Sequence, residues 1–407
     1  MKKSFPKNKI NILLLENIHN SAAKLLAADG FNVSSVASSL SKKELLSKIE
    51  NVHILGIRSK TEVDQDILKA AKKLLAIGTF CIGTNQIDKS FAAQKGVVVF
   101  NAPYSNTRSV VELALGEMIL LIRNIIAKNK LLHEGIWDKT TTNSYEIRGK
   151  VLGIVGYGNI GSQLSVLAEA MGMQVVFYDL GDKLALGNAK RMNTLADVLK
   201  KADVVSLHID GREENTCLIG KKELDMMKPG SIFLNLSRGH VVDYKALKKA
   251  LLNKRIAGAA VDVYPDEPIA NQDGFVSELQ GLPNVILTPH IGGSTQEAQE
   301  HIGDFVAKKL IQFINKGDTY GAVNFPKVQL PAFQDSHRML HIHYNKPGIL
   351  ASINTLFAKY KANIQSQSLN TYGDVGYVIT DINTNYDKQL IADLSAVKHT
   401  IKLRILY

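Results

Sequence analysis

Residues 151–161 have the sequence VLGIVGYGNIG, an apolar run followed by three glycines spaced as Gly-x-Gly-x-x-Gly. An apolar strand that turns through such glycines into a helix is typical of a dinucleotide-binding βαβ unit. Gly156 permits the tight turn, Gly158 lets the backbone approach a pyrophosphate, and Gly161 allows close packing of helix on strand. The N–H groups and the dipole of the helix N-terminus attract the phosphates.

The residue that ends the next apolar run, 174–178, is Asp179. A carboxylate here accepts hydrogen bonds from the ribose hydroxyls and repels a 2′-phosphate. The following Leu180-Gly181-Asp182 contains no arginine that would reverse this preference, so the sequence predicts NAD rather than NADP. The alternative is a glycine-rich turn in another α/β protein, but that alternative does not explain the order of strand, glycines, helix and acid.

Composition limits the class of protein. A chain of 407 residues is long enough for two or three domains. Cys81 and Cys217, its two cysteines, lie in unrelated segments, which predicts no disulfide framework, no metal site and a reducing cytoplasm. The apolar run 10–15 contains Asn11 and ends at Glu16, so it is too short for a signal peptide or a membrane span.

The net charge of +11 is carried by lysines spread in ones and twos along the chain. No basic block and no interleaved aromatic stripe is present, so we do not expect a nucleic acid or a membrane as partner. A solvated basic surface that also attracts anionic substrates explains the pattern better.

Periodicity predicts the domain organisation. Short apolar runs at 10–15, 52–57, 74–77 and 97–100 alternate with helical patterns such as 20–28 and 41–49, which favours a parallel sheet. A long helix is predicted over 109–134, ended by Gly135. After the glycine motif, further strands at 204–208, 231–236, 258–263 and 285–288 complete a doubly wound sheet, and a helix over 295–314 returns to the first domain.

The C-terminal segment has a different pattern. The stretch up to residue 335 contains prolines and is poorly periodic, which indicates a linker. Beyond it we predict strand 338–344, helix 348–359, strands 363–370 and 375–382, helix 388–396 and strand 400–406. This βαββαβ order is the ferredoxin-like unit, a separate small domain.

Three loops that follow predicted strands carry chemistry. They contain Ser237-Arg238-Gly239, Asp262 to Glu267-Pro268, and Pro289-His290. Arg238 can hold a carboxylate through two parallel hydrogen bonds, although a surface salt bridge is the alternative. His290 is a candidate acid and base, and Glu267 would orient it and raise its pKa; alone, each could be an ordinary packing or surface residue.

Taken together, these motifs resemble the D-isomer-specific 2-hydroxyacid dehydrogenases. The resemblance includes Asn101 to Val110 and Thr288 to Glu300, covers residues 10–407, and is closest to members with a C-terminal ACT domain. It implies an α/β fold with a Rossmann-type NAD domain (108–295) inserted in a flavodoxin-like substrate domain (1–107 and 296–330). A ferredoxin-like ACT domain (337–407) follows.

The resemblance also implies an activity, the NAD-dependent oxidation of 3-phosphoglycerate to 3-phosphohydroxypyruvate in serine biosynthesis. Arg238, Glu267 and His290 would be catalytic, and the substrate contacts would be Arg58, Ser59, Gly83 and Asn106. The NAD contacts would be Gly156, Gly158, Asn159, Ile160, Gly161, Asp179, Leu236, Ser237, Arg238, Asp262, His290, Ile291, Gly292 and Gly293.

Regulation and assembly follow from the same resemblance. ACT domains bind small amino acids between paired subunits, and the ligands for L-serine as effector would be His343, Asn345 and Asn363. A homotetramer is expected, and a side reduction of 2-oxoglutarate is possible in this family. Two alternatives remain open: a dehydrogenase of another D-2-hydroxyacid, and an NAD-sensing binding protein on the same scaffold.

Overall fold

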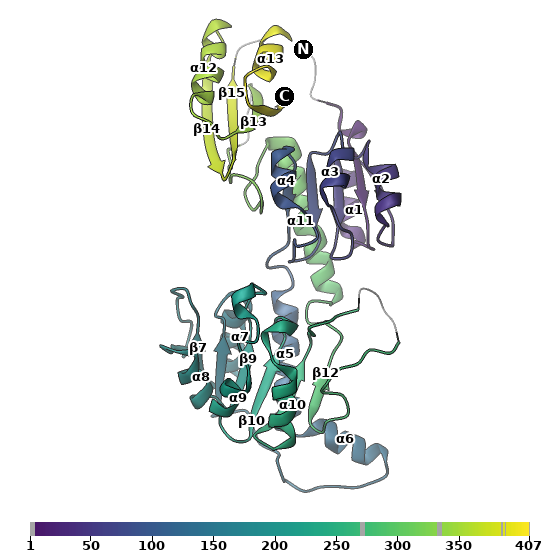
Figure 1. Ribbon diagram of the computed structural model, residues 1–407, viewed down its shortest axis with the longest axis vertical. Helices are drawn as coiled ribbons and strands as arrows, with labels where there is room; N and C mark the ends of the chain where they lie inside the picture. The colour runs from purple at the N-terminus through teal and green to yellow at the C-terminus, as the bar shows by residue number, and fades with distance from the viewer. Residues whose placement is uncertain (1–4, 269–272, 332–335, 384–385, 387, 407) are drawn as a thin grey trace. The chain divides into compact units, whose positions relative to one another are not determined.

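The computed structural model describes residues 5–268, 273–331, 336–383, 386 and 388–406 (Figure 1). The chain divides into two compact units. Unit 1 comprises Met1–Ser105 with Gln299–Tyr407, and unit 2 comprises Asn106–Ala298. Among the described residues, no helix combines the length and the apolar composition that a membrane crossing needs.

Unit 1 begins with a parallel five-stranded sheet of order β2-β1-β3-β4-β5. Its strands are β1 (Asn11–Leu14), β2 (Asn32–Ser35), β3 (Ile54–Ile57), β4 (Ala76–Thr79) and β5 (Val98–Phe100). The turn η1 (Lys7–Lys9) precedes them, and the helices between them are α1 (Asn20–Ala28), α2 (Lys42–Ile49), α3 (Gln65–Ala70) and α4 (Lys89–Gln94). The four predicted strands are confirmed. The edge strand β2 was not predicted, because its sequence NVSS is polar and largely exposed.

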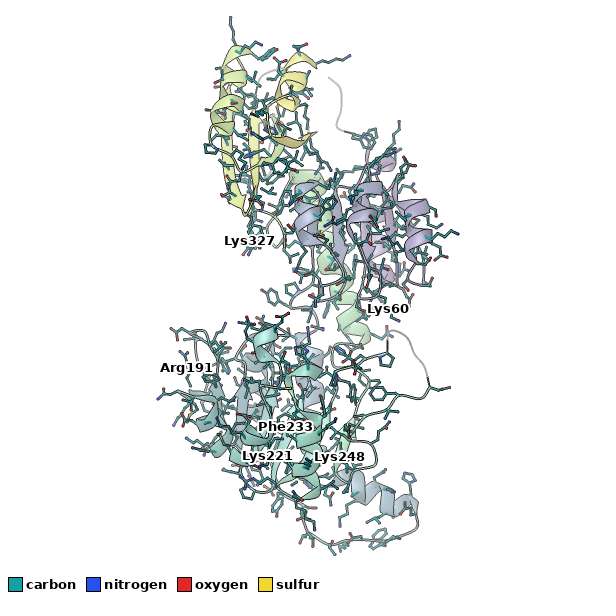
Figure 2. The ribbon with its side chains drawn as sticks, viewed as in Figure 1. Lys60, Arg191, Lys221, Phe233, Lys248 and Lys327 are labelled. Carbon is teal, nitrogen blue, oxygen red and sulfur yellow. The ribbon has the colours of Figure 1, made fainter. Side chains whose placement is uncertain are left out.

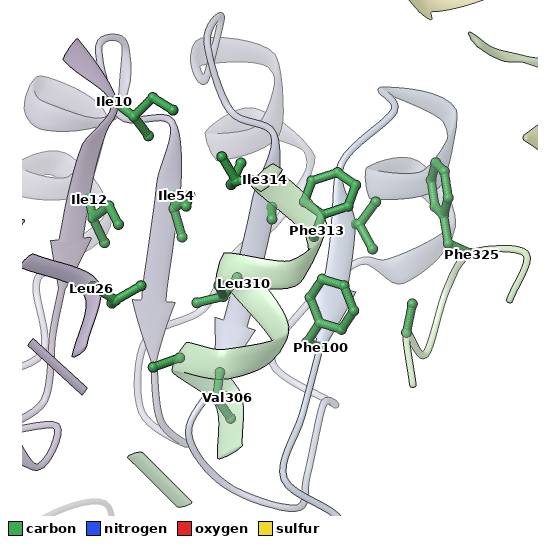
Figure 3. Close-up of a cluster of buried hydrophobic side chains, with 14 of the residues drawn as sticks. Ile10, Ile12, Leu26, Ile54, Phe100, Val306, Leu310, Phe313, Ile314 and Phe325 are labelled. Atoms are coloured by element: carbon green, nitrogen blue, oxygen red, sulfur yellow. The ribbon is translucent and has the colours of Figure 1, made fainter. Parts of the chain in front are cut away.

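The predicted return helix is confirmed as α11 (Gln296–Lys316). Its apolar residues Val306, Leu310 and Phe313 enter the core that the first sheet forms with α1 (Figure 3). The ring of Phe313 lies 5.9 Å from that of Phe100 on β5. Helix α11, although distant in the sequence, therefore completes the core of the N-terminal sheet.

The C-terminal part of unit 1 has the predicted βαββαβ order. Its elements are β13 (His337–Tyr344), α12 (Ile349–Lys359), β14 (Ile364–Tyr372), β15 (Val375–Ile382), α13 (Lys388–Ser395) and β16 (Thr400–Leu406). They form an antiparallel sheet of order β14-β15-β13-β16. Met339 and Val378 pack with α12 and α13, whereas Leu340 and Tyr377 join the core that contains Phe313. This sheet is therefore covered on both faces.

A buried ion pair connects this sheet to the chain before it. Arg338 is 1% exposed, and its Nε and Nη2 each lie 2.7 Å from a carboxylate oxygen of Asp381. The same guanidinium donates to the backbone oxygens of Lys316 and Pro331, both at 3.0 Å. The end of α11 and the predicted linker are thus fixed against this antiparallel sheet; residues 332–335 of that linker lie outside the described residues.

Unit 2 contains a parallel seven-stranded sheet of order β12-β11-β10-β9-β6-β7-β8. Its strands are β6 (Val151–Val155), β7 (Gln174–Tyr178), β8 (Lys190–Arg191), β9 (Val204–Leu207), β10 (Ser231–Asn235), β11 (Ile256–Val261) and β12 (Val285–Leu287). The remaining elements are α5 (Thr107–Ile122), α6 (Ile125–His133), α7 (Asn159–Ala170), α8 (Leu195–Lys201), η2 (Glu213–Asn215), α9 (Lys221–Met226), η3 (Gly239–Val241) and α10 (Tyr244–Leu252). The predicted doubly wound sheet is confirmed.

The prediction of one helix over 109–134 is wrong. The helix α5 ends at Ile122, Asn124 adopts a left-handed conformation with φ 52°, and α6 begins at Ile125. Asparagine tolerates this conformation better than other side chains, so it can end a helix inside an apolar sequence. No residue of α6 is buried, which means that its isoleucines and leucines do not extend the core of α5.

We expect Phe313→Ala to lower the unfolding free energy by about 3–5 kcal/mol, because it leaves a cavity where α11 meets both sheets of unit 1. Urea unfolding followed by circular dichroism measures the loss. Leu46→Ala on α2 is the matched control, since Leu46 is exposed and its truncation changes stability by about 0.5 kcal/mol or less. A loss below about 1 kcal/mol for Phe313→Ala would contradict this role in the core.

Candidate active site

The glycine motif lies at the point where the strand order of unit 2 reverses. The central strand β6 pairs with β7 on one side and β9 on the other, and a ligand crevice forms outside the carboxyl ends of strands at such a point. Gly156 follows β6 with φ 94°, and a Cβ there would lie 2.4 Å from the backbone oxygen of His208, which follows β9. Glycine is therefore required by conformation and by this approach.

The next two glycines differ in what surrounds them. A Cβ on Gly161 would lie 2.3 Å from the backbone oxygen of Gly156, so helix α7 packs directly on the turn. A Cβ on Gly158 would meet no atom within 4 Å. Gly158 precedes Asn159, the first residue of α7, and no side chain caps that helix. Open space over uncapped backbone N–H groups fits a pyrophosphate.

The carboxylate of Asp179 is held beside this turn. Its Oδ2 accepts from the backbone N–H of Tyr157 and its Oδ1 from that of Gly181, both at 2.8 Å. The ring of Tyr157 stacks on Phe177 with centroids 3.8 Å apart, which fixes the turn against β7. Because a carboxylate oxygen has two acceptor positions, both oxygens can also accept from ribose hydroxyls.

Arg191 lies beside Asp179 in the structure, although the residues that directly follow Asp179 in the sequence include no arginine. Arg191 on β8 donates to the backbone oxygens of Asp179 and Gly181 at 3.3 and 3.1 Å (Figure 2). Its Nη1 lies 2.8 Å from the carboxylate of Asp182. The pairing of β7 with the short strand β8 brings it there, and no local pattern signals such a pairing.

Glu267 and His290 form a hydrogen-bonded pair. Nδ1 of His290 lies 2.6 Å from Oε2 of Glu267, and Oε1 of Glu267 accepts from the backbone N–H of Tyr264 at 2.9 Å. The hydrogen bond to Glu267 raises the pKa of His290, and burial opposes this only in part. Burial raises the pKa of Glu267, but the bonds from His290 and Tyr264 outweigh it, so the net shift is downward.

The position of His290 depends on Asp262. The buried carboxylate of Asp262 accepts from Thr288 Oγ1 at 2.6 Å and from the backbone N–H groups of Ile291 and Gly292 at 2.8 Å. His290 lies between these anchors with φ 55°. Nδ1 points to Glu267, and Nε2 has no protein partner in the described part of the chain. The loop therefore presents Nε2 as its proton-accepting atom.

Arg238 is held at the end of β10. Asn235 Oδ1 accepts from the N–H and the hydroxyl of Ser237, and Asn235 Nδ2 donates to the backbone oxygen of Arg238 at 3.0 Å. A Cβ on Gly239 would collide with the backbone of Tyr264, so this loop packs against the one that carries Glu267. Arg238 donates to the oxygen of Ser237 but forms no ion pair with a described carboxylate, which leaves its charge for a ligand.

Two titratable residues near this site, the buried Glu117 and the half-buried His208, were missed by sequence reasoning. Glu117 on α5 is 2% exposed, and neither carboxylate oxygen has a hydrogen-bond partner among the described residues. Burial, helped by the charge of Asp262, raises its pKa to about 8. His208 is kept neutral because burial lowers its pKa to about 4, and its Nε2 lies 2.8 Å from Ser206 Oγ. The sequence did contain a signal that Glu117 is unusual, because this acidic residue lies within the apolar run of α5.

The predicted substrate contacts are distributed over both units. Arg58, Ser59 and Gly83 belong to unit 1, and Asn106 belongs to unit 2. Glu16 accepts from the backbone N–H groups of Lys60 and Thr61, at 3.0 and 2.8 Å, and so fixes the loop after β3 that contains Arg58. In unit 2 the amide of Asn106 lies against Gly293, where a Cβ would be 2.2 Å from Nδ2.

The predicted effector ligands do not meet within one chain. His343 is buried on β13, and Asn345 Nδ2 donates to the oxygen of Gly373 at the β14–β15 turn. Asn363 precedes β14 at the opposite end, beside Asn383. Because a nine-residue strand spans roughly 30 Å, Asn363 lies far from Asn345.

Groups of three or more His, Cys, Asp or Glu that could hold a metal are absent from the described residues.

This fold and site define an NAD-dependent dehydrogenase. The family profile described as "D-isomer specific 2-hydroxyacid dehydrogenase, NAD binding domain" matches residues 115–292, and the profile "AHAS small subunit-like ACT domain" matches residues 339–402. The chain belongs to the D-isomer-specific 2-hydroxyacid dehydrogenase family. The expectations of an NAD domain and an ACT domain are thereby confirmed.

Relatives similar over the full length carry a more specific name. The chain is 50% identical over 404 residues to D-3-phosphoglycerate dehydrogenase of Dictyostelium discoideum, covering 99% of both chains. It is 48% identical over 409 residues to the protein of that name from Escherichia coli K12, covering 100% of both. A solved structure of D-lactate dehydrogenase with NAD⁺ from Lactobacillus jensenii is 27% identical, with a TM-score of 0.66, and covers 75% of this chain and 97% of that one.

The open space at Gly158 predicts a separable effect on NADH. Gly158 has φ −82° and ψ −154°, which other residues adopt, so Gly158→Val should fold with an unchanged melting temperature. Its side chain would occupy the pyrophosphate position, and we expect the Kd for NADH to rise at least about tenfold. Fluorescence titration with NADH measures this change.

Gly161→Ala is the contrasting variant, because its added methyl meets the backbone of Gly156 and should lower the melting temperature. Normal NADH affinity in Gly158→Val would contradict the placement of the pyrophosphate.

Proposed function

We propose that this chain catalyses the NAD-dependent oxidation of 3-phosphoglycerate to 3-phosphohydroxypyruvate, the first step of L-serine biosynthesis. The observation that carries the substrate is the full-length identity of about half to relatives named D-3-phosphoglycerate dehydrogenase. The reaction class is supported by the loops that present Arg238 and the pair of His290 and Glu267 in unit 2.

The roles of the side chains follow from their geometry. The turn at Gly158 and the carboxylate of Asp179 would hold NAD, which when bound would accept the hydride of the substrate carbon. His290 Nε2 takes the proton of the substrate hydroxyl, and Glu267 stabilises the imidazolium that results. Arg238 holds the carboxylate through parallel hydrogen bonds. Its positive charge also favours the oxygen that loses its proton.

The remaining predicted contacts are part of the same proposal. Arg58, Ser59, Gly83 and Asn106 are each proposed as contacts to the rest of the substrate, whose phosphate needs N–H and O–H donors. Arg58 forms no ion pair with a described carboxylate, so its guanidinium is available to an anion. The remaining predicted NAD contacts, Leu236, Ser237, Asp262 and Ile291 to Gly293, all lie on the loops that follow β10, β11 and β12.

L-Serine is the proposed effector, and it would bind between two chains. Asn363 lies at one end of β14, whereas His343 and Asn345 lie near the other, so one ligand can contact all three only if a second ACT domain supplies Asn363. This requires at least a homodimer, and a tetramer is our proposal for the full assembly.

An assay of NADH oxidation with 3-phosphohydroxypyruvate tests the proposed function. We expect kcat/KM for this substrate to exceed that for pyruvate, 2-oxoglutarate and hydroxypyruvate by at least about a hundredfold. Pyruvate and hydroxypyruvate lack the phosphate group, and 2-oxoglutarate carries a carboxylate of different shape in its place. Equal or faster turnover of another 2-oxoacid would indicate a different D-2-hydroxyacid dehydrogenase. NADH binding without any turnover would indicate a sensor.

The Glu267–His290 pair predicts the pH dependence of the reaction. Reduction needs protonated His290, so its rate is full below the raised pKa and falls as the pH rises through it. Glu267→Gln removes the carboxylate and lowers that pKa, so the fall should occur at lower pH, with a reduced kcat. His290→Ala should lower kcat by about 10²–10⁴-fold while NADH still binds. An unchanged pH profile in Glu267→Gln would contradict the pairing.

The divided serine site predicts complementation between chains. Asn345→Ala and Asn363→Ala should each abolish inhibition by serine, whereas Asn370→Ala, an exposed change on β14, should not. Co-expression of the first two variants should restore inhibition, since each mixed pair then contains one site with both asparagines intact. Inhibition assays on the purified mixture measure this. If mixed assemblies stay insensitive, the residues do not act across chains.

A further inference from the structure

A cavity of about 900 Å³ lies within unit 1, where β16 of the ACT sheet faces the loops that precede β1, β3 and β4. Six cationic side chains line it, together with His53 and several apolar residues, and none of the described residues in its lining carries a carboxylate. These cations are Lys7, Lys9, Lys72, Lys73, Lys402 and Arg404. None of them was a candidate functional residue in the sequence, where lysines are spread evenly along the chain.

Two of the cations lie on the same face of the ACT sheet as residues of the unit 1 core. Lys402 and Arg404 on β16 lie opposite Ile342 and Leu340 of β13, which belong to the core. Lys402 Nζ donates to the backbone oxygen of Leu74 at 2.9 Å, and Arg404 Nη2 donates to that of Ile314 at 3.3 Å. The guanidinium of Arg404 also lies over the ring of Phe313, 4.9 Å from its centroid, and its buried Nη1 has no hydrogen-bond partner among the described residues.

The positive charge of this cavity is only partly compensated. Lys7 pairs with Asp29 at 2.9 Å and Lys72 with Glu50 at 2.7 Å, and both acids lie outside the lining. The other four cations form no ion pair with a carboxylate of the described residues, although Lys73 donates to Asn51 Oδ1. Burial, with the charge of Arg404, lowers the pKa of Lys402 to about 8. Lys402 and Arg404 are half-buried, and like charges in such positions cost stability unless an anion accompanies them.

We propose that this cavity binds a small organic polyanion carrying two or more phosphate or carboxylate groups. Its volume falls within the range of small-molecule sites. The apolar residues Leu75, Ile314 and Ile405 in its wall would contact the carbon skeleton, while the ammonium and guanidinium groups bind the charged ends. The bound anion would connect β16 to the first sheet of unit 1, so it would favour their packed arrangement.

This site is separate from the substrate contacts and the serine ligands proposed above, because it shares no residue with either. It gives a specific purpose to part of the net charge of +11. The inference does not rest on the proposed reaction, since the cavity and its charges are independent of the loops that carry Arg238 and His290.

Isothermal titration of the full-length enzyme with tripolyphosphate and with citrate, at constant ionic strength, tests the proposal. We expect saturable binding of at least one of them, and the two probes distinguish phosphate from carboxylate chemistry. Lys73→Gln and Lys402→Gln should each weaken the Kd about tenfold, because each removes one charge-assisted hydrogen bond. Lys73 is exposed, so its variant should fold normally.

Lys43→Gln, on the exposed surface of α2 and outside the cavity, is the matched control and should leave the Kd unchanged. Absence of binding by both probes would overturn the proposal. So would binding that persists unchanged in both cavity variants, since the anion would then occupy another site. A DNA duplex that binds where both probes fail, with the same loss in the variants, would assign a nucleic-acid surface instead.

Discussion

The close approach of Gly156 to the backbone oxygen of His208 is the constraint on which unit 2 depends. It brings together the chain ends that follow β6 and β9, at the point where the strand order reverses. Gly161 then packs α7 on the same turn, and Gly158 leaves open space above the uncapped helix N-terminus. A side chain at either packed position would separate these elements, and the crevice for the cofactor would be lost.

Carboxylates organise the chemistry beside that crevice in three different ways. Asp179 holds the turn of the glycine motif, Asp262 fixes the loop that carries His290, and Glu267 sets the orientation and the pKa of its imidazole. Each accepts hydrogen bonds from one or two backbone N–H groups. The positions of the reactive groups are therefore determined by backbone hydrogen bonds, which are insensitive to the identity of neighbouring side chains.

Much of the fold could be predicted because the spacing of apolar residues within a short segment is enough to indicate a strand or a helix. The strands of both parallel sheets and the βαββαβ order have patterns that need no distant partner. The predictions failed where the outcome depended on context: β2 is a polar edge strand, and none of the apolar residues of α6 is buried after Asn124 ends α5. Arg191 and Glu117 were missed for the same reason, since tertiary packing brings them to Asp179 and Asp262.

The sequence by itself determined the type of cofactor site, because the glycine motif and Asp179 depend on residue chemistry at fixed spacing within one βαβ unit. It also offered Arg238, Glu267 and His290 on three loops as candidates, whose catalytic roles the family resemblance implied. Only the tertiary structure decided which nitrogen of His290 is left for a substrate, and that Asn363 lies far from Asn345 in one chain. It also decided that four cations without an ion pair among the described residues meet around one cavity. The physical reason is that charges and hydrogen bonds act through space, and residues distant in the chain meet only when the sheets and their covering helices pack.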